Sequence, residues 1–175
     1  TPLEIQSFIN EFTDLLKKKC AEFDLKLPKL LFEPGRAIVG PAGLTVYKVG
    51  AVKEVKGIKT FLFIDGGMAD NPRPILYQAK HDIATVIKKN KNKKIYSIAG
   101  KFCESGDILA ENVTLEEVEV GDYIIVFATG AYNYSMASNY NRNTRPAMVL
   151  VEDKNAKLIV KRETYEDLIR LDIEL

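Results

Sequence analysis

A cysteine and a glutamate stand side by side just before a glycine turn, in the stretch Cys103-Glu104-Ser105-Gly106. Neighbouring side chains of an extended chain point to opposite faces, but a turn directly after them can direct both into one cavity. The pair could therefore act as a thiol acid beside an anionic binding group. The alternative is a buried cysteine that fills apolar space next to a solvated glutamate, and the motif taken alone favours this alternative.

A second polar segment runs from Asp65 to Pro74 and leads to Tyr77. Its glycine pair lets the backbone approach a ligand closely. Arg73, between two prolines, has a stiff backbone that suits the presentation of a guanidinium to a carboxylate. A surface turn with a solvated arginine explains this segment equally well. His81, the only histidine, is expected to be a structural residue with its hydrogen bonds satisfied.

A third polar segment starts at Gly130-Ala131-Tyr132, at the end of a strongly apolar stretch, and runs to Arg142. It is rich in tyrosine and asparagine, and this density suggests a buried polar surface rather than an exposed loop. By residue type alone, tyrosines that fill an interface are the more common explanation.

The composition narrows the class of protein. With 175 residues, 46% of them hydrophobic, one sizeable domain is expected. The formal net charge of +1 predicts neither a nucleic acid nor an anionic membrane as partner. Two cysteines far apart give no disulfide framework and indicate a reducing, cytoplasmic location. No apolar run approaches the ~20 residues of a membrane span.

Several catalytic motifs are absent from the sequence. It has no phosphate-binding loop, no nucleophile elbow and no metal-ligand cluster, and with one histidine no His-based triad is expected. Hydrolytic and nucleotide-binding functions therefore lose most of their support, and a metal site is not predicted.

The first 40 residues suggest the end of a barrel of alternating helices and strands. Thr1, Pro2 and Glu4 form a helix start, after which apolar residues recur with the helical period. The apolar run Lys29–Phe32 is typical of a parallel strand covered on both faces, and Glu33-Pro34-Gly35-Arg36 follows at its carboxyl end, where such barrels bind ligands. One helix and one strand cannot close a barrel, so we expect them to be its last turn.

From residue 41 onward the pattern changes to strands rich in valine, isoleucine, tyrosine and phenylalanine, separated by turns. Strands are expected at 44–55, 60–64, 84–87, 95–102, 123–128, 148–151 and 158–160. Turns are expected at 90–93, as the exposed tip of a hairpin, and at 120–122 and 153–156, and a short helix from Thr164 with Asp167 as its capping partner. This pattern predicts an antiparallel β-barrel or sandwich.

Four stretches, in this order along the chain, together resemble the diaminopimelate decarboxylase family, which are pyridoxal-phosphate enzymes of the alanine-racemase-like fold. The stretches are Glu33-Pro34-Gly35-Arg36, Asp65-Gly66-Gly67 with Arg73-Pro74 and Tyr77, Cys103-Glu104-Ser105-Gly106-Asp107, and Gly130-Ala131-Tyr132. Each motif alone is weak, but four in register are strong evidence.

The resemblance implies a mostly β fold in two parts. Residues 1–40 would be the last helix and strand of a truncated (β/α)8 barrel that binds pyridoxal phosphate. Residues 41–175 would be an antiparallel β-barrel, like the C-terminal domain of alanine racemase, with a short terminal helix. The lysine that binds the cofactor covalently lies earlier in the first barrel of the family, so this chain alone is expected to be inactive.

The resemblance also implies a site for pyridoxal 5'-phosphate. Glu33 would keep the pyridine nitrogen protonated, since a nearby carboxylate stabilises the cation. Pro34 belongs to the same motif, and Gly35 and Arg36 would lie against the cofactor phosphate. Tyr132 would contact the phosphate as well, and Arg36 and Tyr132 would also reach the substrate.

The implied reaction is decarboxylation of meso-2,6-diaminopimelate to L-lysine and CO2, the last step of lysine biosynthesis. Arg73 and Tyr77 would bind the distal carboxylate of the substrate, and Glu104 its distal ammonium. Cys103 would donate the proton that replaces the departing CO2. In the family, the residues that match Cys103 and Glu104 come from the neighbouring subunit, so the resemblance implies a homodimer with shared active sites.

Three alternatives remain at this point. An ornithine or arginine decarboxylase of the same fold is the nearest one, although Arg73, Tyr77 and the Cys103–Gly106 stretch favour a substrate with a distal carboxylate. A non-catalytic relative that dimerises with a decarboxylase is the second, and the presence of Cys103 and Glu33 argues against it. A free-standing ligand-binding barrel is the third, and it would leave the strand at 29–32 without a role.

Overall fold

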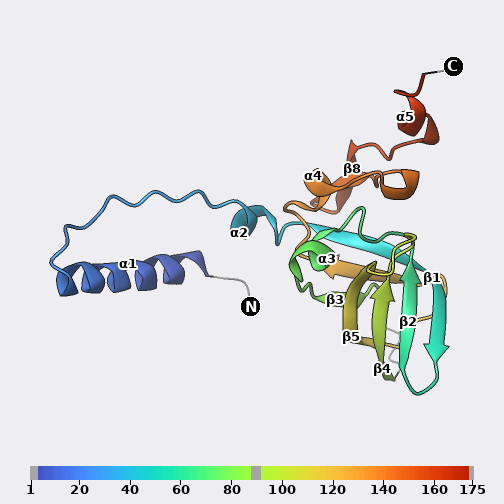
Figure 1. The fold of residues 1–175 in the computed structure, drawn as a ribbon, viewed down its shortest axis with the longest axis horizontal. Coiled ribbons are helices and arrows are strands. Elements are labelled where there is room, and N and C mark those ends of the chain that lie inside the picture. Colours follow the sequence, from blue (N-terminus) through green and yellow to red (C-terminus); the bar gives the residue numbers. More distant parts are fainter. Residues whose placement is uncertain (1–3, 88–91, 174–175) are drawn as a thin grey trace.

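The computed structural model describes residues 4–87 and 92–173, and its centre is a six-stranded sheet that curls into a nearly closed barrel (Figure 1). The strand order is β3-β6-β1-β2-β4-β5. The strands are β1 (Leu44–Val55), β2 (Lys59–Ile64), β3 (Ile83–Thr85), β4 (Lys93–Ala99), β5 (Ile108–Glu116) and β6 (Tyr123–Phe127). Neighbours are antiparallel except β2 and β4, which are parallel because the chain between them crosses over through α3 (Arg73–Tyr77) and β3.

The barrel encloses the hydrophobic core. Along β2, buried positions alternate with half-buried ones, which is the two-residue period of a strand with one face inside. Leu62, Ile98 and Ile124, from three different strands, are fully buried, and each such side chain contributes about 1.5–3 kcal/mol relative to an exposed one. The other members of the core cluster are Tyr47, Val49, Ile64, Tyr96, Leu109, Leu115, Val118 and Val126.

Most of the predicted strands are present, but the region around β3 and β5 differs from the prediction. β3 pairs with β6 and not with β4, so the turn predicted at 90–93 is not the tip of a hairpin, and residues 90 and 91 lie outside the described residues. β5 is absent from the sequence prediction. The polar pair Glu111 and Asn112 interrupts its apolar pattern, and Asn112 adopts a φ of 56° there.

The strand predicted at 29–32 does not form. Leu31 is 82% exposed, and no described strand lies beside this segment. A strand needs the hydrogen bonds of a neighbouring strand, so an apolar run without that neighbour stays irregular.

The helix predicted near the start of the chain is α1 (Ile5–Glu22). Glu4 caps it, because its carboxylate accepts a hydrogen bond from Ser7 N at 2.7 Å, whereas Thr1 and Pro2 lie outside the described residues. Glu4 is therefore the cap itself and not its partner. Figure 1 shows α1 at a distance from the barrel, beyond a long irregular segment. Apolar side chains are exposed along α1 and along the irregular segment: Ile5, Phe8, Leu15, Phe23, Leu25, Leu27, Leu31 and Phe32.

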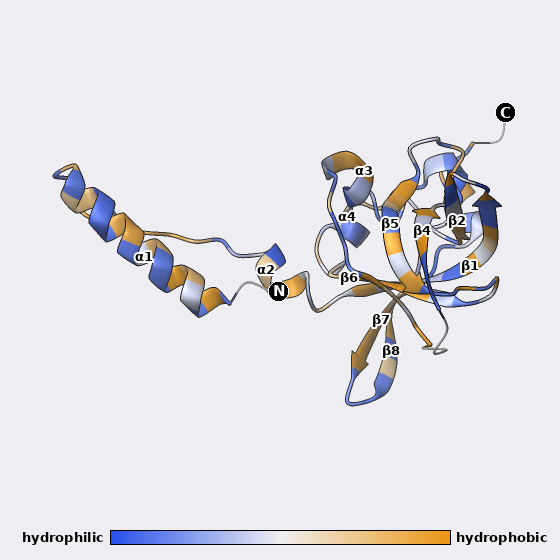
Figure 2. Ribbon diagram, turned by 90° about the horizontal axis from the view of Figure 1, so that it is seen from below, coloured by the Kyte–Doolittle hydropathy of each residue, from blue (hydrophilic) through white to orange (hydrophobic). Residues whose placement is uncertain are grey.

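A hairpin of β7 (Met148–Glu152) and β8 (Asn155–Val160) projects from the barrel, as Figure 2 shows. Its turn at 153–154 and the capping box of Thr164 and Asp167 at the start of α5 (Tyr165–Ile169) confirm the predictions for this region. The mostly β fold class is confirmed. No helix in the described ranges is long and apolar enough to cross a membrane.

Candidate active site

Arg73, the first residue of α3, lies over two tyrosine rings. Its guanidinium carbon Cζ is 5.4 Å from the ring centre of Tyr77 and 5.2 Å from that of Tyr132. Within the described parts of the chain, no carboxylate forms an ion pair with this guanidinium. Its charge is therefore stacked on aromatic faces but not neutralised, an arrangement that suits the binding of an anion.

Tyr132 has an unusual backbone conformation, with φ 69° and ψ −30°. Bulky side chains rarely adopt positive φ values. The residue directly precedes α4 (Asn133–Met136), and Met136 N donates a hydrogen bond to the Tyr132 carbonyl at 2.8 Å. Strained residues of this kind persist where surrounding contacts enforce them, and they concentrate at ligand sites.

A short helix, α2 (Arg36–Val39), is tied to the turn that precedes Tyr132. Gly130 N donates a hydrogen bond to the Gly40 carbonyl at 3.0 Å. The backbones are so close that a Cβ on Gly130 would lie 2.0 Å from the Val39 carbonyl oxygen. This contact brings the helix that begins with the predicted phosphate ligand to the base of the Tyr132 loop.

Cys103 and Glu104 lie on an exposed turn before β5. Cys103 N donates to Asn141 Oδ1 at 3.1 Å, from the short helix η1 (Tyr140–Arg142), and the thiol is free. Glu104 Oε1 accepts hydrogen bonds from Ser105 Oγ and Gly106 N, both at 3.3 Å. Both side chains are exposed, so the alternative of a buried cysteine that fills apolar space is wrong, and within this chain the turn does not direct the pair into a cavity.

Asp107 anchors this turn to the neighbouring loop. Its side chain is buried, with 3% of the residue exposed, and accepts hydrogen bonds from Met68 N at 2.7 Å and from Phe102 N at 2.9 Å. A Cβ on Gly100 would lie 2.0 Å from the Asp107 carboxylate, so only glycine fits there. Burial raises the pKa of the Asp107 carboxyl above its usual range, although the two N–H donors oppose the shift.

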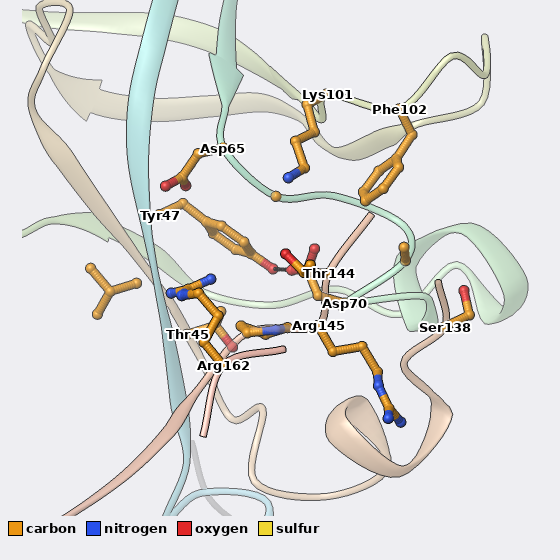
Figure 3. A pocket seen from close by; sticks show the side chains of 14 residues that line it. Thr45, Tyr47, Asp65, Asp70, Lys101, Phe102, Ser138, Thr144, Arg145 and Arg162 are labelled. Carbon is orange, nitrogen blue, oxygen red and sulfur yellow. Dashed lines mark hydrogen bonds between the residues drawn. The ribbon is translucent and has the colours of Figure 1, made fainter. Parts of the chain in front are cut away.

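A second carboxylate, the half-buried Asp70, supports the same loop. The Tyr47 hydroxyl donates a hydrogen bond to Asp70, which also accepts one from Gly67 N at 2.9 Å. Burial raises the pKa of Asp70 and that of Tyr47. Figure 3 shows both side chains in a pocket of about 70 Å³ with Lys101 and Arg145. None of the predicted site residues lines this pocket, so it is separate from the candidate site.

The structure does not bring all the predicted site residues together. In the described ranges, no hydrogen bond, ion pair or ring contact links Cys103 or Glu104 with Arg73 or its two tyrosines. Glu33 and Pro34 lie in the exposed segment before α2. No group of three His, Cys, Asp or Glu side chains that could hold a metal ion occurs in this part of the chain.

His81 was predicted to have its hydrogen bonds satisfied, and this holds for one ring nitrogen only. Its Nδ1 lies 2.8 Å from the Phe127 carbonyl oxygen. Its Nε2 is buried without a hydrogen-bond partner among the described residues. The contact with β6 is structural, as expected, but the side chain is not fully satisfied.

Sequence reasoning missed the buried or half-buried polar residues that position the loops: Tyr47, Asp70, Asn71, Asp107 and Asn133. A polar residue in a loop is usually exposed, so composition gives no sign of burial. The only available signal was proximity, since four of the five stand within three residues of a predicted site residue.

Comparison with known proteins agrees with this architecture. Residues 14–130 match the model of the pyridoxal-dependent decarboxylase C-terminal sheet domain. The chain therefore belongs to the pyridoxal-dependent decarboxylase family through this sheet domain, and the predicted family is confirmed.

Similar proteins within this family include diaminopimelate decarboxylases. The chain is 48% identical to the enzyme of Bacillus subtilis over 173 residues, which are 98% of this chain and 39% of that protein. It is 48% identical to the enzyme of Synechocystis over 98% of this chain and 37% of that protein. The chain thus spans about two fifths of the length of these relatives.

Solved structures give the same result. The diaminopimelate decarboxylase of M. jannaschii superimposes with a TM-score of 0.80 at 45% identity, over 86% of this chain and 34% of that one. Its complex with L-lysine gives a TM-score of 0.80 at 43% identity, over 91% of this chain and 36% of that one. A lysine/ornithine decarboxylase of Vibrio vulnificus is less similar, with a TM-score of 0.58, 28% identity and coverage of 65% of this chain and 31% of that one.

Proposed function

We propose that the polypeptide to which this chain belongs decarboxylates meso-diaminopimelate to L-lysine and CO2. The observation that carries the proposal is Arg73, whose unneutralised guanidinium lies within cation–π range of the rings of Tyr77 and Tyr132. Because no carboxylate of the described residues pairs with it, its N–H groups are the donors left for a ligand. They match the two oxygens of a carboxylate. A substrate with a distal carboxylate fits this site, whereas ornithine and lysine have none.

The chain also offers groups suited to the cofactor implied by its family. Gly35 has open space where a Cβ would stand, so a phosphate could approach its backbone. The guanidinium of Arg36 and the hydroxyl of Tyr132 supply charge and a hydrogen-bond donor for that phosphate. The hydrogen bond from Gly130 N to the Gly40 carbonyl holds the segments of Arg36 and Tyr132 together. These residues fit pyridoxal phosphate. The proposal includes the division of the chain into residues 1–40, as the end of the cofactor-binding barrel, and residues 41–175, as the β-barrel.

The predicted site residues of this chain each have a defined task in the proposed reaction. When bound, pyridoxal phosphate supplies an electron sink for the pair of electrons left behind as CO2 departs. Glu33 would accept a hydrogen bond from the ring nitrogen of the bound cofactor and would favour its protonated form. Arg73 and Tyr77 hold the distal carboxylate, and Glu104 pairs with the distal ammonium.

Cys103 completes the reaction by transferring a proton. Its Sγ donates the proton to the carbon that has lost CO2, and the thiol regains one from solvent. We propose further that Cys103 and Glu104 act in the active site of a second copy of the enzyme. Their exposure on the turn before β5 supports this assignment, because side chains at the surface are available to a neighbouring subunit.

The proposal is tested with the whole enzyme, supplied with pyridoxal phosphate and assayed for CO2 release from diaminopimelate, ornithine, arginine and lysine. We expect diaminopimelate to be the preferred substrate. Arg73→Met should lower kcat/KM for diaminopimelate by a factor of about 100 or more, since it removes a charged bidentate contact. Lys154→Ala, in the exposed turn of the β7–β8 hairpin, is the matched control. A preference for ornithine or arginine, or an Arg73→Met variant as active as the control, would overturn the assignment.

A mixing experiment tests the shared site. Cys103→Ala and Arg73→Met enzymes are each nearly inactive under the proposal. If each site takes these residues from different subunits, each mixed dimer regains one of its two sites, so an equal mixture regains about a quarter of all sites on random reassociation. If both residues act within one subunit, mixing restores nothing, and the shared-site proposal is wrong.

A further inference from the structure

Two buried asparagines join the loops that carry Arg73 and Tyr132. Asn71 is 0% exposed and Asn133 is 4% exposed, and Asn133 Nδ2 donates a hydrogen bond to Asn71 Oδ1 at 2.5 Å. The remaining amide atoms, Asn71 Nδ2 and Asn133 Oδ1, have no hydrogen-bond partner among the described residues. The bond between the two amides is therefore the one hydrogen bond found for either side chain in that part of the molecule.

The position of each asparagine is transmitted to a site residue over a very short stretch of backbone. Only Pro72 separates Asn71 from Arg73, and its ring fixes the φ angle of the connection. Asn133 directly follows Tyr132, whose φ of 69° is unfavourable for a side chain of its size. A strained residue relaxes unless a neighbouring contact prevents it, and the amide bond is such a contact.

We propose that Asn71 and Asn133 are positioning residues for the carboxylate site. Their buried hydrogen bond keeps Tyr132 in its left-handed conformation with its ring against Arg73. The bond thereby orients the guanidinium edge toward the distal carboxylate of the substrate. This inference rests on the proposed function for its kinetic consequence, but its structural part concerns this chain alone.

The test uses the whole enzyme, saturated with pyridoxal phosphate, with Asn71→Ala, Asn133→Ala and the double variant. Each single variant should raise KM for diaminopimelate about 3- to 10-fold, the ratio that corresponds to one net hydrogen bond, and leave kcat within about twofold. Because both residues act through one bond, the double variant should raise KM no further than either single variant. KM increases that multiply in the double variant would indicate two independent structural effects and overturn the proposal.

Two further measurements separate positioning from loss of stability. Ile98→Val, a cavity-forming change inside the barrel, is the control: it should lower the thermal unfolding temperature and leave KM unchanged. If Ile98→Val raises KM as much as Asn133→Ala does, KM reports stability and the proposal is wrong. Crystal structures of wild type and Asn133→Ala provide a readout independent of substrate. We expect residue 132 of the variant to relax to a negative φ and its ring to move more than about 6 Å from the guanidinium, beyond cation–π range.

The crystal structures also distinguish failure of this inference from failure of the proposed function. An enzyme inactive toward diaminopimelate whose Asn133→Ala variant still loses the Arg73–Tyr132 contact refutes the function and leaves the positioning role intact. An Asn133→Ala variant with the contact and the φ of residue 132 unchanged refutes the positioning role, whatever the substrate.

Discussion

Replacement of Asp107 by alanine is expected to release the turn that carries Cys103. The Asp107 carboxylate accepts hydrogen bonds from Met68 N and Phe102 N, and the residue is 3% exposed. Asp107→Ala removes both acceptors at once, leaving two N–H groups without their partner. The loop at 66–70 and the turn at 101–106 would then be joined mainly by the Lys101 N bond to the Gly66 carbonyl, at 3.0 Å.

The loss of stability expected for Asp107→Ala follows from the number of hydrogen bonds that it removes. Each buried donor that loses its acceptor costs about 1–3 kcal/mol, so the pair costs about 2–6 kcal/mol. Part of this cost is offset. Burial raises the pKa of Asp107, so its charged form is destabilised in the folded protein, and Asp107→Ala removes that unfavourable contribution. We therefore expect a net loss of about 2–4 kcal/mol in the stability of this region. The loss is local, because the barrel core does not include Asp107.

Hydrogen exchange read by mass spectrometry on the whole enzyme measures this loss directly. Protection of the amides of Met68 and Phe102 should fall at least about tenfold in Asp107→Ala, since 1.4 kcal/mol corresponds to a factor of ten. Protection of the β2 amides at Leu62 and Ile64 should not change, and they serve as the internal control. If the amides of Met68 and Phe102 keep their wild-type protection, the carboxylate is not their acceptor in solution and the reasoning fails.

Two further predictions concern other contacts. Glu163 accepts hydrogen bonds from Arg145 Nε at 2.7 Å and Arg145 N at 2.8 Å, and these bonds lower its pKa to about 2. The stabilisation is present above the usual pKa of about 4.5 and is lost as the pH falls toward 2. Glu163→Gln should therefore cost about 1–2 kcal/mol at pH 7, allowing for solvent around the pair, and progressively less below pH 4.5 in urea unfolding series. A difference from wild type that does not depend on pH would contradict this. Gly130→Ala should push its Cβ into the Val39 carbonyl and destabilise the contact with α2 by about 1–3 kcal/mol, which thermal unfolding measures; an unchanged midpoint would show that the two backbones are not in contact.

The sequence predicted the elements whose stability comes from their own residues. β1 was predicted with its observed limits, Leu44–Val55, because a long run of β-branched and aromatic residues ends in a glycine turn at both sides. The strand at 29–32 was predicted by the same criterion and is absent, since no described strand lies beside it to share its hydrogen bonds. β5 shows the opposite case: its partner β4 holds it in the sheet although Glu111 and Asn112 interrupt the pattern.

The candidate site was predictable as a set of motifs but not as a geometry. The resemblance selected Arg73, Tyr77 and Tyr132, and nothing in their spacing required the arginine to lie over both rings. Under our proposal, that contact depends on the positive φ of Tyr132 and on the buried amides of Asn71 and Asn133. These features arise from tertiary packing, because propensity alone would place asparagine in an exposed turn and tyrosine at negative φ.

The stacked arginine also explains why lysine would not serve at this position. A guanidinium is planar and weakly hydrated, so aromatic rings can cover its faces while its edge still donates to a carboxylate. An ammonium covered in the same way would lose hydration on every side and could make no bidentate contact. Arg73→Lys should therefore keep the charge yet lower kcat/KM for diaminopimelate by at least about tenfold, the discrimination expected from one lost charge-assisted bond. If Arg73→Lys is as active as wild type, charge alone suffices, and the contact of Arg73 with Tyr77 and Tyr132 has no part in substrate selection.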